Sequence, residues 1–262
     1  MTLSKQEWLG LMIGNSRLHW AYFVHDELQQ TWNTSKADSL TGLGQVIPSQ
    51  LNSYLQCQIP LYVASVVPSA TKLYLKLPQT TIINSQRIPL GGVYSTMGID
   101  RILALWGGGC RYQFPCLVID SGTALTFTGA NGDRQLMGGA ILPGVRLQME
   151  TLFFNTAALP EIEIMEQIIP RWAMDTPCAI QSGIIYTIVG GIKGFIDDWL
   201  KQYPRSAIVL TGGDTFILQQ YLKQVYPSLA NKMIFDPDLI FFGIQEYINT
   251  INLDTPPLNQ RL

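Results

Sequence analysis

Three short segments of the chain combine glycine with residues that can bind phosphate, hold a cation or accept a proton. Two of them are turns that follow apolar runs, and the third opens an apolar helical pattern. They are Gly14-Asn15-Ser16, Asp120-Ser121-Gly122-Thr123 and Gly98-Ile99-Asp100-Arg101. Each segment alone is a weak signal, because short glycine motifs occur often.

The two turns suit the binding of a nucleotide's phosphates. A glycine turn after a buried strand brings backbone N–H groups close to a ligand, and Asn, Ser or Thr adds side-chain donors. Asp120, at the end of its strand, offers the oxygen ligands that a hard cation prefers. For either turn alone, an ordinary hairpin turn is the alternative. The occurrence of the same turn twice favours phosphate binding.

The third segment suits the site of an acceptor substrate. Helix capping accounts for an acidic residue in a first turn, but Arg101 in that turn opposes the helix dipole. An aspartate that accepts a proton, beside an arginine that binds an anion, suits a kinase. The residues by themselves leave capping and substrate binding both open.

The elements that must position these segments form an internal repeat. The strands predicted for the two copies lie at residues 8–13, 18–24 and 28–32, and at 116–119, 124–130 and from about 134. Asn131-Gly132 in the second copy predicts a type I′ hairpin turn. Gly14 and Gly122 occupy the same place in the two copies.

Strand and helix patterns follow each copy and predict an α/β protein. The further strands lie at 61–67 and 207–211, and the helices at 99–112, 177–202, 216–225 and 243–250. We expect two halves, residues 1–115 and 116–262, that face each other across a central cleft, where ligands usually bind.

The composition is that of a compact protein without a broad basic face. Hydrophobic residues make up 47% and charged residues 14% of the chain, against an average of about 25% charged. The net charge of −2 argues against nucleic acid or an anionic membrane as a partner.

The cysteines and the most apolar stretch indicate a cytoplasmic protein. Cys57, Cys110, Cys116 and Cys178 are scattered, which predicts buried thiols in a reducing compartment, with no zinc site and no disulfide. The N-terminus lacks the pattern of a signal peptide. The apolar stretch 179–196 contains four polar residues and is predicted to be a buried helix rather than a membrane span.

Seven motifs, in order along the chain, resemble those of type III pantothenate kinase. They are GNS at 14–16, ASVVP at 64–68, GIDR at 98–101, DSGTALT at 120–126, GGAILPG at 138–144, the Thr176…Ala179…Gly183 segment and TGGD at 211–214. The resemblance runs from about residue 9 to 250. Any one motif is weak, but seven in register are specific.

The resemblance implies two ribonuclease-H-like halves of the actin-like ATPase type and a homodimer. It implies ATP-dependent phosphorylation of pantothenate to 4′-phosphopantothenate, the first step of coenzyme A biosynthesis. The implied cofactors are Mg²⁺ with the ATP and a monovalent cation, K⁺ or NH₄⁺.

The resemblance also implies roles for individual residues. Asp100 is the general base and Asp120 binds the monovalent cation. The pantothenate site is formed by Tyr94, Gly98, Ile99, Asp100, Arg101 and Thr176. The ATP site is formed by Met12, Ile13, Gly14, Asn15, Ser16, Arg17 and Thr123. Thr176-Pro177 is also a suitable N-cap and N1 pair for the long helix.

Two departures from the family pattern leave alternatives open. Met12 stands where the family has an aspartate, and the segment from Tyr94 to Gly98 is shorter than usual. The alternatives are a catalytically weak or inactive regulatory homologue and a related small-molecule kinase of the same fold, although GIDR argues against the latter. The short chain disfavours an actin-like assembly protein, and P-loop, dinucleotide-binding and protein-kinase motifs are absent from the sequence.

Overall fold

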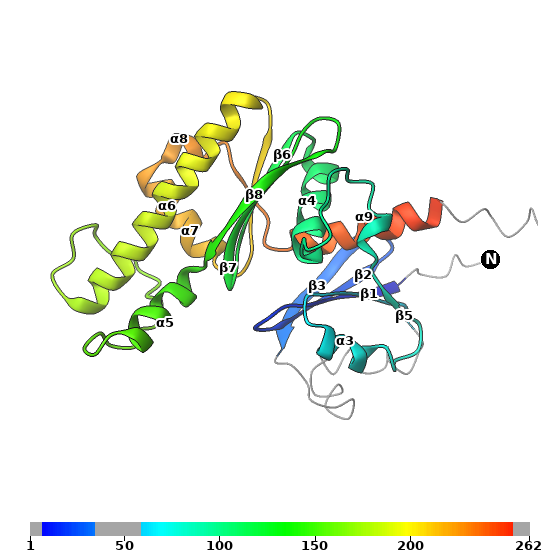
Figure 1. Ribbon diagram of the computed structural model, residues 1–262, viewed down its shortest axis with the longest axis horizontal. Coiled ribbons are helices and arrows are strands. Elements are labelled where there is room, and N and C mark those ends of the chain that lie inside the picture. Colours follow the sequence, from blue (N-terminus) through cyan, green and yellow to red (C-terminus); the bar gives the residue numbers. More distant parts are fainter. Residues whose placement is uncertain (1–6, 35–58, 254–262) are drawn as a thin grey trace, which may run out of the picture. The chain divides into compact units, whose positions relative to one another are not determined.

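The computed structural model describes residues 7–34 and 59–253. Their contacts divide the chain into two compact units, shown in Figure 1. Unit 1 comprises Met1–Pro89, Tyr94–Gly107 and Ile240–Leu262, and unit 2 comprises Leu90–Val93 and Gly108–Leu239. The C-terminal segment thus groups with the N-terminal half, so the two units do not coincide with the expected halves 1–115 and 116–262, which stay a prediction.

Unit 1 is built on a mixed five-stranded sheet. The strands are β1 (Glu7–Ile13), β2 (Leu18–Val24), β3 (Glu27–Thr34), β4 (Leu61–Ser65) and β5 (Thr80–Ile82), in the order β3-β2-β1-β4-β5. β1 pairs antiparallel with β2 and parallel with β4. The helices that begin or lie in this unit are α3 (Pro68–Tyr74), α4 (Ile99–Tyr112) and α9 (Leu239–Leu253), with a short 3-10 turn at Ser85–Arg87.

Unit 2 repeats this topology. Its strands are β6 (Cys116–Ser121), β7 (Ala124–Ala130), β8 (Leu136–Pro143), β9 (Ala207–Thr211) and β10 (Ile234–Phe235), in the order β10-β9-β6-β7-β8. Its helices are α5 (Val145–Asn155), α6 (Thr176–Gln202), α7 (Thr215–Val225) and α8 (Pro227–Ala230). Counted from its other edge, this order is β8-β7-β6-β9-β10, which corresponds strand by strand to β3-β2-β1-β4-β5 of unit 1. The α/β class and the internal repeat are therefore confirmed.

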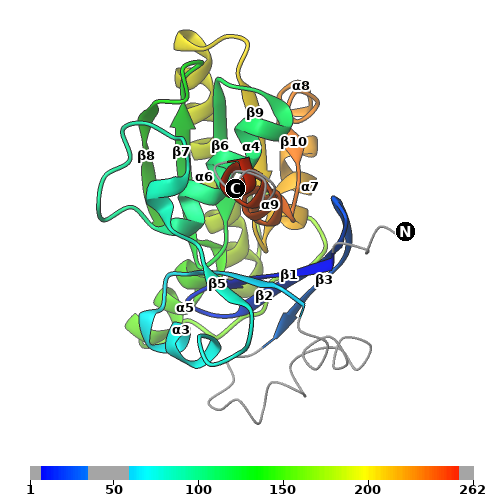
Figure 2. The same cartoon turned by 90° about the vertical axis from the view of Figure 1, so that its right-hand side faces the viewer.

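Alternating side chains build a separate core in each unit. In unit 1, Leu9, Leu11 and Ile13 point to one face of β1 and pack with Trp20 and Tyr74. In unit 2, Ile119 and Phe127 pack against buried residues of α6 and α7, which lie along one face of the sheet in Figures 1 and 2. The period of two in the strands explains why both sheets bury one apolar face in this way.

The hairpin between β7 and β8 lies where it was predicted, but the predicted type I′ turn is wrong. That turn needs positive φ at both central residues, whereas the positive φ here, +58°, belongs to Arg134. The side-chain oxygen of Asn131 accepts hydrogen bonds from the N–H groups of Asp133 and Gln135, at 3.0 and 2.9 Å. These bonds stabilise a longer turn in place of the two-residue one.

Helix α6 is the only helix in the described part of the chain that is long and apolar enough to cross a membrane, by length and composition alone. Half of its most apolar window is buried inside the protein, and nine of its residues pack into unit 2. The prediction of a buried core helix for this stretch is confirmed.

The cysteines only partly fit their predicted environment. Cys116 is buried, but Cys110 is exposed and Cys178 is partly so, while Cys57 lies outside the described residues. Burial raises the pKa of the Cys116 thiol to about 12. This thiol is therefore protonated at neutral pH and unreactive.

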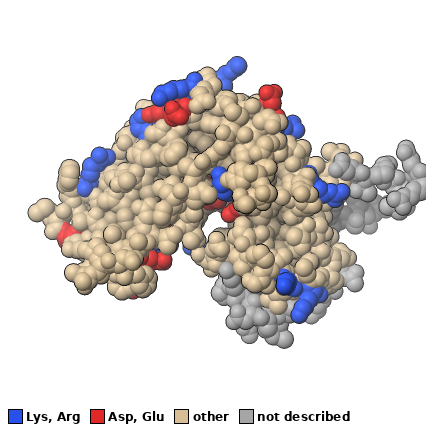
Figure 3. All heavy atoms as spheres, in the orientation of Figure 1, with Lys and Arg blue, Asp and Glu red and all other residues tan. Residues whose placement is uncertain are grey.

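Charged residues are sparse on the face drawn in Figure 3. Lys and Arg are scattered there and gather into no broad basic patch. This face agrees with the low charge content of the sequence.

Candidate active site

A tight turn closes the end of β1. The N–H of Gly14 donates to the carbonyl oxygen of Arg17 at 3.0 Å, and a Cβ atom on residue 14 would lie 3.2 Å from that oxygen. Asn15, Ser16 and Arg17 are exposed. The turn therefore presents polar groups to solvent at the carboxyl end of a buried strand, as a phosphate-binding turn must.

The Gly98–Arg101 segment lies near this turn within unit 1. Ile13 pairs with Ser65 across the parallel strands β1 and β4, and the N–H of Val66 donates to the carbonyl oxygen of Ile13 at 3.1 Å. The position of a Cβ on Gly98 is 3.8 Å from Cγ1 of Val66. Both motifs thus lie near the carboxyl ends of two parallel strands, where α/β proteins bind ligands.

The carboxylate of Asp100 folds back over Gly98. Its Oδ1 accepts a hydrogen bond from the N–H of Arg101 at 2.8 Å. A Cβ atom on residue 98 would overlap this oxygen, so this position of the carboxylate depends on glycine at residue 98. Asp100 is partly exposed at the start of α4.

Arg101 and Tyr94 are in direct contact. Nη1 of Arg101 donates to the hydroxyl oxygen of Tyr94 at 2.9 Å. Arg101 is only 7% exposed, whereas Tyr94 is 47% exposed. A buried guanidinium needs polar partners, and Tyr94 supplies one. The short segment from Tyr94 to Gly98 does not prevent this contact.

Helix α9 supports the helix that carries these residues. Leu103 and Leu105 of α4 are fully buried. A Cβ atom on Gly243 would overlap the carbonyl oxygen of Leu103, so α4 and α9 pack backbone against backbone. The sequence motifs do not predict that α9 packs against α4, the helix that carries Asp100.

In unit 2, Asp120 lies at the end of β6 beside a glycine in a left-handed conformation. Asp120 pairs with Thr211 of β9, and Gly212 follows with φ of +94°. A Cβ atom on Gly212 would overlap both Oδ1 of Asp120 and the carbonyl oxygen of Ser121. Two oxygen atoms therefore border one small space.

This donor set fits a hard monovalent cation. Carboxylate and carbonyl oxygens are ligands for hard cations rather than for zinc or copper. Residues 7–34 and 59–253 contain no group of three or more His, Cys, Asp or Glu side chains that could hold a metal ion.

The turn after Asp120 packs against a second glycine. The N–H of Gly144 donates to the carbonyl oxygen of Thr123 at 2.9 Å, and a Cβ atom there would overlap the carbonyl oxygen of Gly122. Thr123 is exposed. The last glycine of the GGAILPG motif thus fixes the turn that carries Thr123.

Met12 is buried, with 3% of its surface exposed. It lies on β1 opposite His19 and beside Ala64. No acidic residue takes the place of the family's aspartate on this strand after Glu7.

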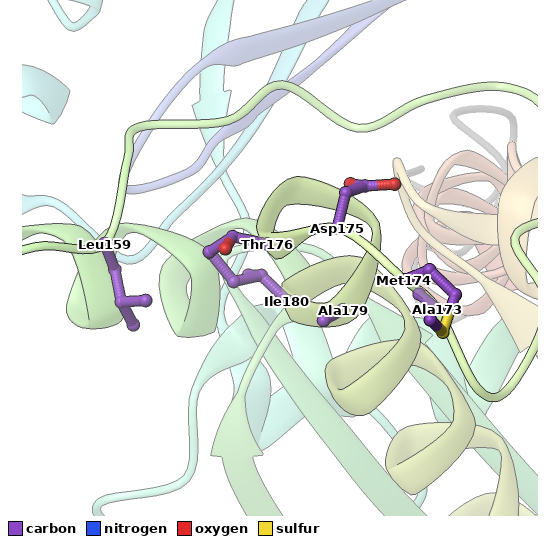
Figure 4. A pocket seen from close by; sticks show the side chains of 7 residues that line it. All are labelled: Leu159, Ala173, Met174, Asp175, Thr176, Ala179 and Ile180. Atoms are coloured by element: carbon purple, nitrogen blue, oxygen red, sulfur yellow. The ribbon is translucent and has the colours of Figure 1, made fainter.

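Thr176 begins α6, but the prediction that it caps this helix is wrong. The N-cap is Asp175, whose side chain accepts a hydrogen bond from the N–H of Cys178 at 2.8 Å. This bond lowers the pKa of Asp175. Thr176 is exposed and lines an open pocket of about 580 Å³, shown in Figure 4. The other lining residues are Leu159, Ala173, Met174, Asp175, Ala179 and Ile180.

The predicted site residues thus form separate groups. In unit 1, residues 12–17 and 98–101 both lie near the ends of β1 and β4, and Tyr94 contacts Arg101. In unit 2, Asp120 and Thr123 share one turn, while Thr176 lies in its own pocket. Gly212 and Gly144 belong to motifs visible in the sequence, but their contacts with the Asp120 turn could not be predicted from it.

The repeated sheets and glycine turns define a protein of the actin-like ATPase and sugar-kinase fold. A protein described as a Baf family transcriptional activator from Campylobacter jejuni has a TM-score of 0.61 at 20% identity, over 94% of this chain and 100% of its own. A protein described as a 2-dehydro-3-deoxygalactonokinase from Sinorhizobium meliloti has a TM-score of 0.55 at 11% identity, over 97% and 99%. At these identities the likeness establishes the fold alone.

The sequence comparisons define the family. The family model for type III pantothenate kinase matches residues 8–198. A type III pantothenate kinase from Nostoc sp. is 42% identical over 93% of this chain and 95% of its own length. The chain belongs to the type III pantothenate kinase family.

Proposed function

We propose that this protein transfers the γ-phosphoryl group of ATP to the primary hydroxyl of pantothenate. The products are 4′-phosphopantothenate and ADP, and the reaction is the first step of coenzyme A biosynthesis. The observation that carries the proposal is the family match over residues 8–198. The positions of Asp100 and Arg101 at the carboxyl ends of β1 and β4 support it.

The chemistry needs a base and an anchor for the acceptor. Asp100 takes the proton of the hydroxyl as its oxygen forms a bond to the γ-phosphorus, and the bond from that phosphorus to the bridging oxygen of ADP breaks. A positioned base contributes about 10²–10⁴-fold to such a step. Arg101, oriented by the Tyr94 hydroxyl, binds the pantothenate carboxylate, and Gly98 and Ile99 line the same site.

We assign nucleotide-binding residues to the glycine turn of each unit. In unit 1 we assign residues 12–17 to ATP, with backbone and side-chain donors at Gly14, Asn15, Ser16 and Arg17. In unit 2 we assign Thr123, which is exposed at the end of its turn. Mg²⁺ enters with ATP as part of the substrate.

Asp120 binds the monovalent cation, K⁺ or NH₄⁺. Its Oδ1 and the carbonyl oxygen of Ser121 border the space beside Gly212, and these are suitable ligands for a hard cation. When bound, the cation supplies the positive charge that lets a polyphosphate lie near this carboxylate.

A homodimer is supported by the exposed face of α6. Gly183, Gly190, Gly191 and Gly194 are exposed, and a Cβ atom on any of them would have no described atom within 4 Å. Glycine inside a helix costs about 0.5–1 kcal/mol relative to alanine, and packing among residues 7–34 and 59–253 does not require it here. We infer that the same face of a second copy approaches closely.

A well-anchored apolar loop lies before this helix. Trp172 and Met174 are 87% and 99% exposed. Buried Gln181 bonds to the backbone N–H and carbonyl of Met165, and Ser182 donates to the carbonyl of Arg171. Exposed apolar side chains on a fixed loop are typical of an interface. Thr176, two residues after Met174, then lies at the edge of the dimer contact, where we assign it to pantothenate.

The protein has the features of a cytoplasmic enzyme without a membrane or nucleic-acid partner. The sparse positive charge and the buried side of α6 support this assignment. No finding favours an inactive regulatory homologue or a kinase for another small molecule.

The acceptor is tested by a coupled assay of ADP release. ATP is supplied with pantothenate, glycerol, acetate or common sugars, each at the same concentration. We expect release with pantothenate alone. Equal or greater release with another acceptor would refute the proposal.

A further inference from the structure

We propose that Arg146 is a further nucleotide-binding residue, which contacts the phosphates of ATP, and that the buried carboxylate of Asp214 positions it. The inference rests on the ATP-dependent function proposed above. It adds a side chain to the turn of unit 2 that carries Thr123, which is already assigned to the nucleotide.

Arg146 lies close to the turn that carries Thr123. It is the second residue of α5, and Gly144 is the N-cap of that helix. Because the N–H of Gly144 donates to the carbonyl oxygen of Thr123 at 2.9 Å, the start of α5 is fixed against this turn.

Asp214 holds Arg146 from the other side of the same turn. Nε of Arg146 lies 3.6 Å from Oδ1 of Asp214, whose side chain is only 5% exposed. The N–H of Asp214 donates to the carbonyl oxygen of Ser121 at 3.0 Å. The ion pair therefore joins the start of α5 to the start of α7 beside the Asp120–Thr123 turn.

The guanidinium of Arg146 retains most of its donors. Within residues 7–34 and 59–253, Asp214 is its only charged or hydrogen-bonding partner, through Nε. The two Nη groups carry four of the five N–H donors of an arginine, and the side chain is 55% exposed. A planar fork of this kind matches a phosphate group.

The local charges are compatible with this role. A cation in the first turn of a helix is opposed by the helix dipole, and in this structure the nearby anion that compensates Arg146 is Asp214. Asp120 and Asp214 would both repel a polyphosphate. Arg146 offsets one of these charges, and the proposed monovalent cation offsets the other.

The opposite side of Arg146 does not suit a phosphate. There Arg146 lines a small pocket of about 160 Å³ with Glu150, Glu161 and Glu163. Three carboxylates would repel an anion from that pocket. We therefore place the phosphates on the side of Asp214.

Steady-state kinetics of Arg146→Gln and Arg146→Lys test the proposal. We expect the KM for ATP to rise roughly tenfold in Arg146→Gln, since a charge-assisted hydrogen bond is lost. The KM for ATP of Arg146→Lys should lie between the values for Arg146→Gln and wild type. The kcat and the KM for pantothenate should stay within about twofold, because neither depends on this contact. Lys201→Gln is the matched control, since it breaks an exposed ion pair of 3.7 Å in the same unit.

The role of Asp214 is tested by a double-mutant cycle. Asp214→Asn removes the charge that positions Arg146, so the KM for ATP should rise, but by a smaller factor than in Arg146→Gln. If Asp214 acts through Arg146, adding Asp214→Asn to Arg146→Gln should cause no further rise. Fully additive effects would refute the positioning role.

Competitive inhibition separates a phosphate contact from other roles. In Arg146→Gln the inhibition constant of ADP should rise while that of adenosine stays unchanged. An unchanged KM for ATP, or equal losses for ADP and adenosine, would overturn the proposal. If wild type released no pantothenate-dependent ADP, the proposed function would fail instead, and equilibrium binding of ADP to both forms would still test Arg146.

Discussion

Gly212 leaves the space that the carboxylate of Asp120 occupies: a Cβ atom on residue 212 would overlap Oδ1 of Asp120. The backbone at Gly212 has φ of +94°, which side-chain-bearing residues rarely adopt. The end of β6 and the TGGD turn after β9 are thereby fitted to each other. This contact underlies the proposed cation site.

We predict that activity depends on a monovalent cation through Asp120. The rate should rise when potassium or ammonium replaces sodium or Tris, because a bound cation offsets the repulsion between this carboxylate and ATP. Asp120→Ala should lose that response, whereas Asp133→Ala, an exposed control, should keep it. Gly212→Ala should behave like Asp120→Ala, while Gly190→Ala, in open space, should not. Indifference of the wild type to the cation would contradict the assignment.

The hydrogen bond from Arg101 to Tyr94 predicts a defect in pantothenate binding. Tyr94→Phe removes the acceptor that orients a buried guanidinium, so the KM for pantothenate should rise roughly fivefold. The KM for ATP should not change. Tyr203→Phe, which lies at the end of α6, serves as the control. Equal KM values for pantothenate in Tyr94→Phe and wild type would remove Tyr94 from the site.

The glycines of α6 predict a dimer that a single bulky charge can break. Light scattering of the wild-type protein should give a molecular mass twice that of one chain, which is 29.2 kDa. Gly190→Arg should be monomeric, since its side chain would enter the proposed close contact. Its helix content should persist, because no other element of the described part of the chain packs against residue 190. Asp198→Arg, a change at another exposed position of the same helix, should stay dimeric. An active wild-type monomer would contradict the dimer.

Much of this architecture could be predicted from local patterns. Helix α4 was predicted with its observed bounds, because an apolar period follows Gly98 and ends before Phe114-Pro115. Helix α5 was missed, since only Val145 and Met149 are buried along it and no apolar face stands out. The N-cap of α6 was misplaced by one residue, because Asp175 and Thr176 can both cap and only the backbone decides.

The candidate site, like the fold, could be predicted only in part from the sequence. Its motifs could be read from residue types, since glycines and polar residues follow apolar strands. The contacts that fix the motifs could not. Each of these contacts joins residues whose proximity depends on tertiary packing. They are the close approach of Gly212 to Asp120, the hydrogen bond from Arg101 to Tyr94 and the packing of Gly243 against α4.

Met12 predicts a weak affinity for magnesium–ATP. A thioether cannot replace a carboxylate as a ligand for a hard cation, so Met12→Asp should lower the magnesium concentration needed for half-maximal rate. The response to pantothenate should not change. Because Met12 is 3% exposed, the variant should also melt at a lower temperature. Its kinetics are therefore compared at a temperature where both forms stay folded.

The measurement is a magnesium titration of both forms at fixed ATP. An identical half-maximal concentration would refute the magnesium role of this position. If only Met12→Asp released ADP with pantothenate, the wild-type protein would be the inactive regulatory homologue instead.

The role of Asp100 as the base in pantothenate phosphorylation is tested most directly by the kcat of Asp100→Asn. The substitution keeps the shape of the side chain and removes its basicity, so pantothenate-dependent kcat should fall by roughly 10²-fold or more. ATP binding and thermal stability should stay near the wild-type values, because the amide oxygen can still accept the bond from the N–H of Arg101. A kcat within a few-fold of wild type would contradict the assignment of Asp100 as the base.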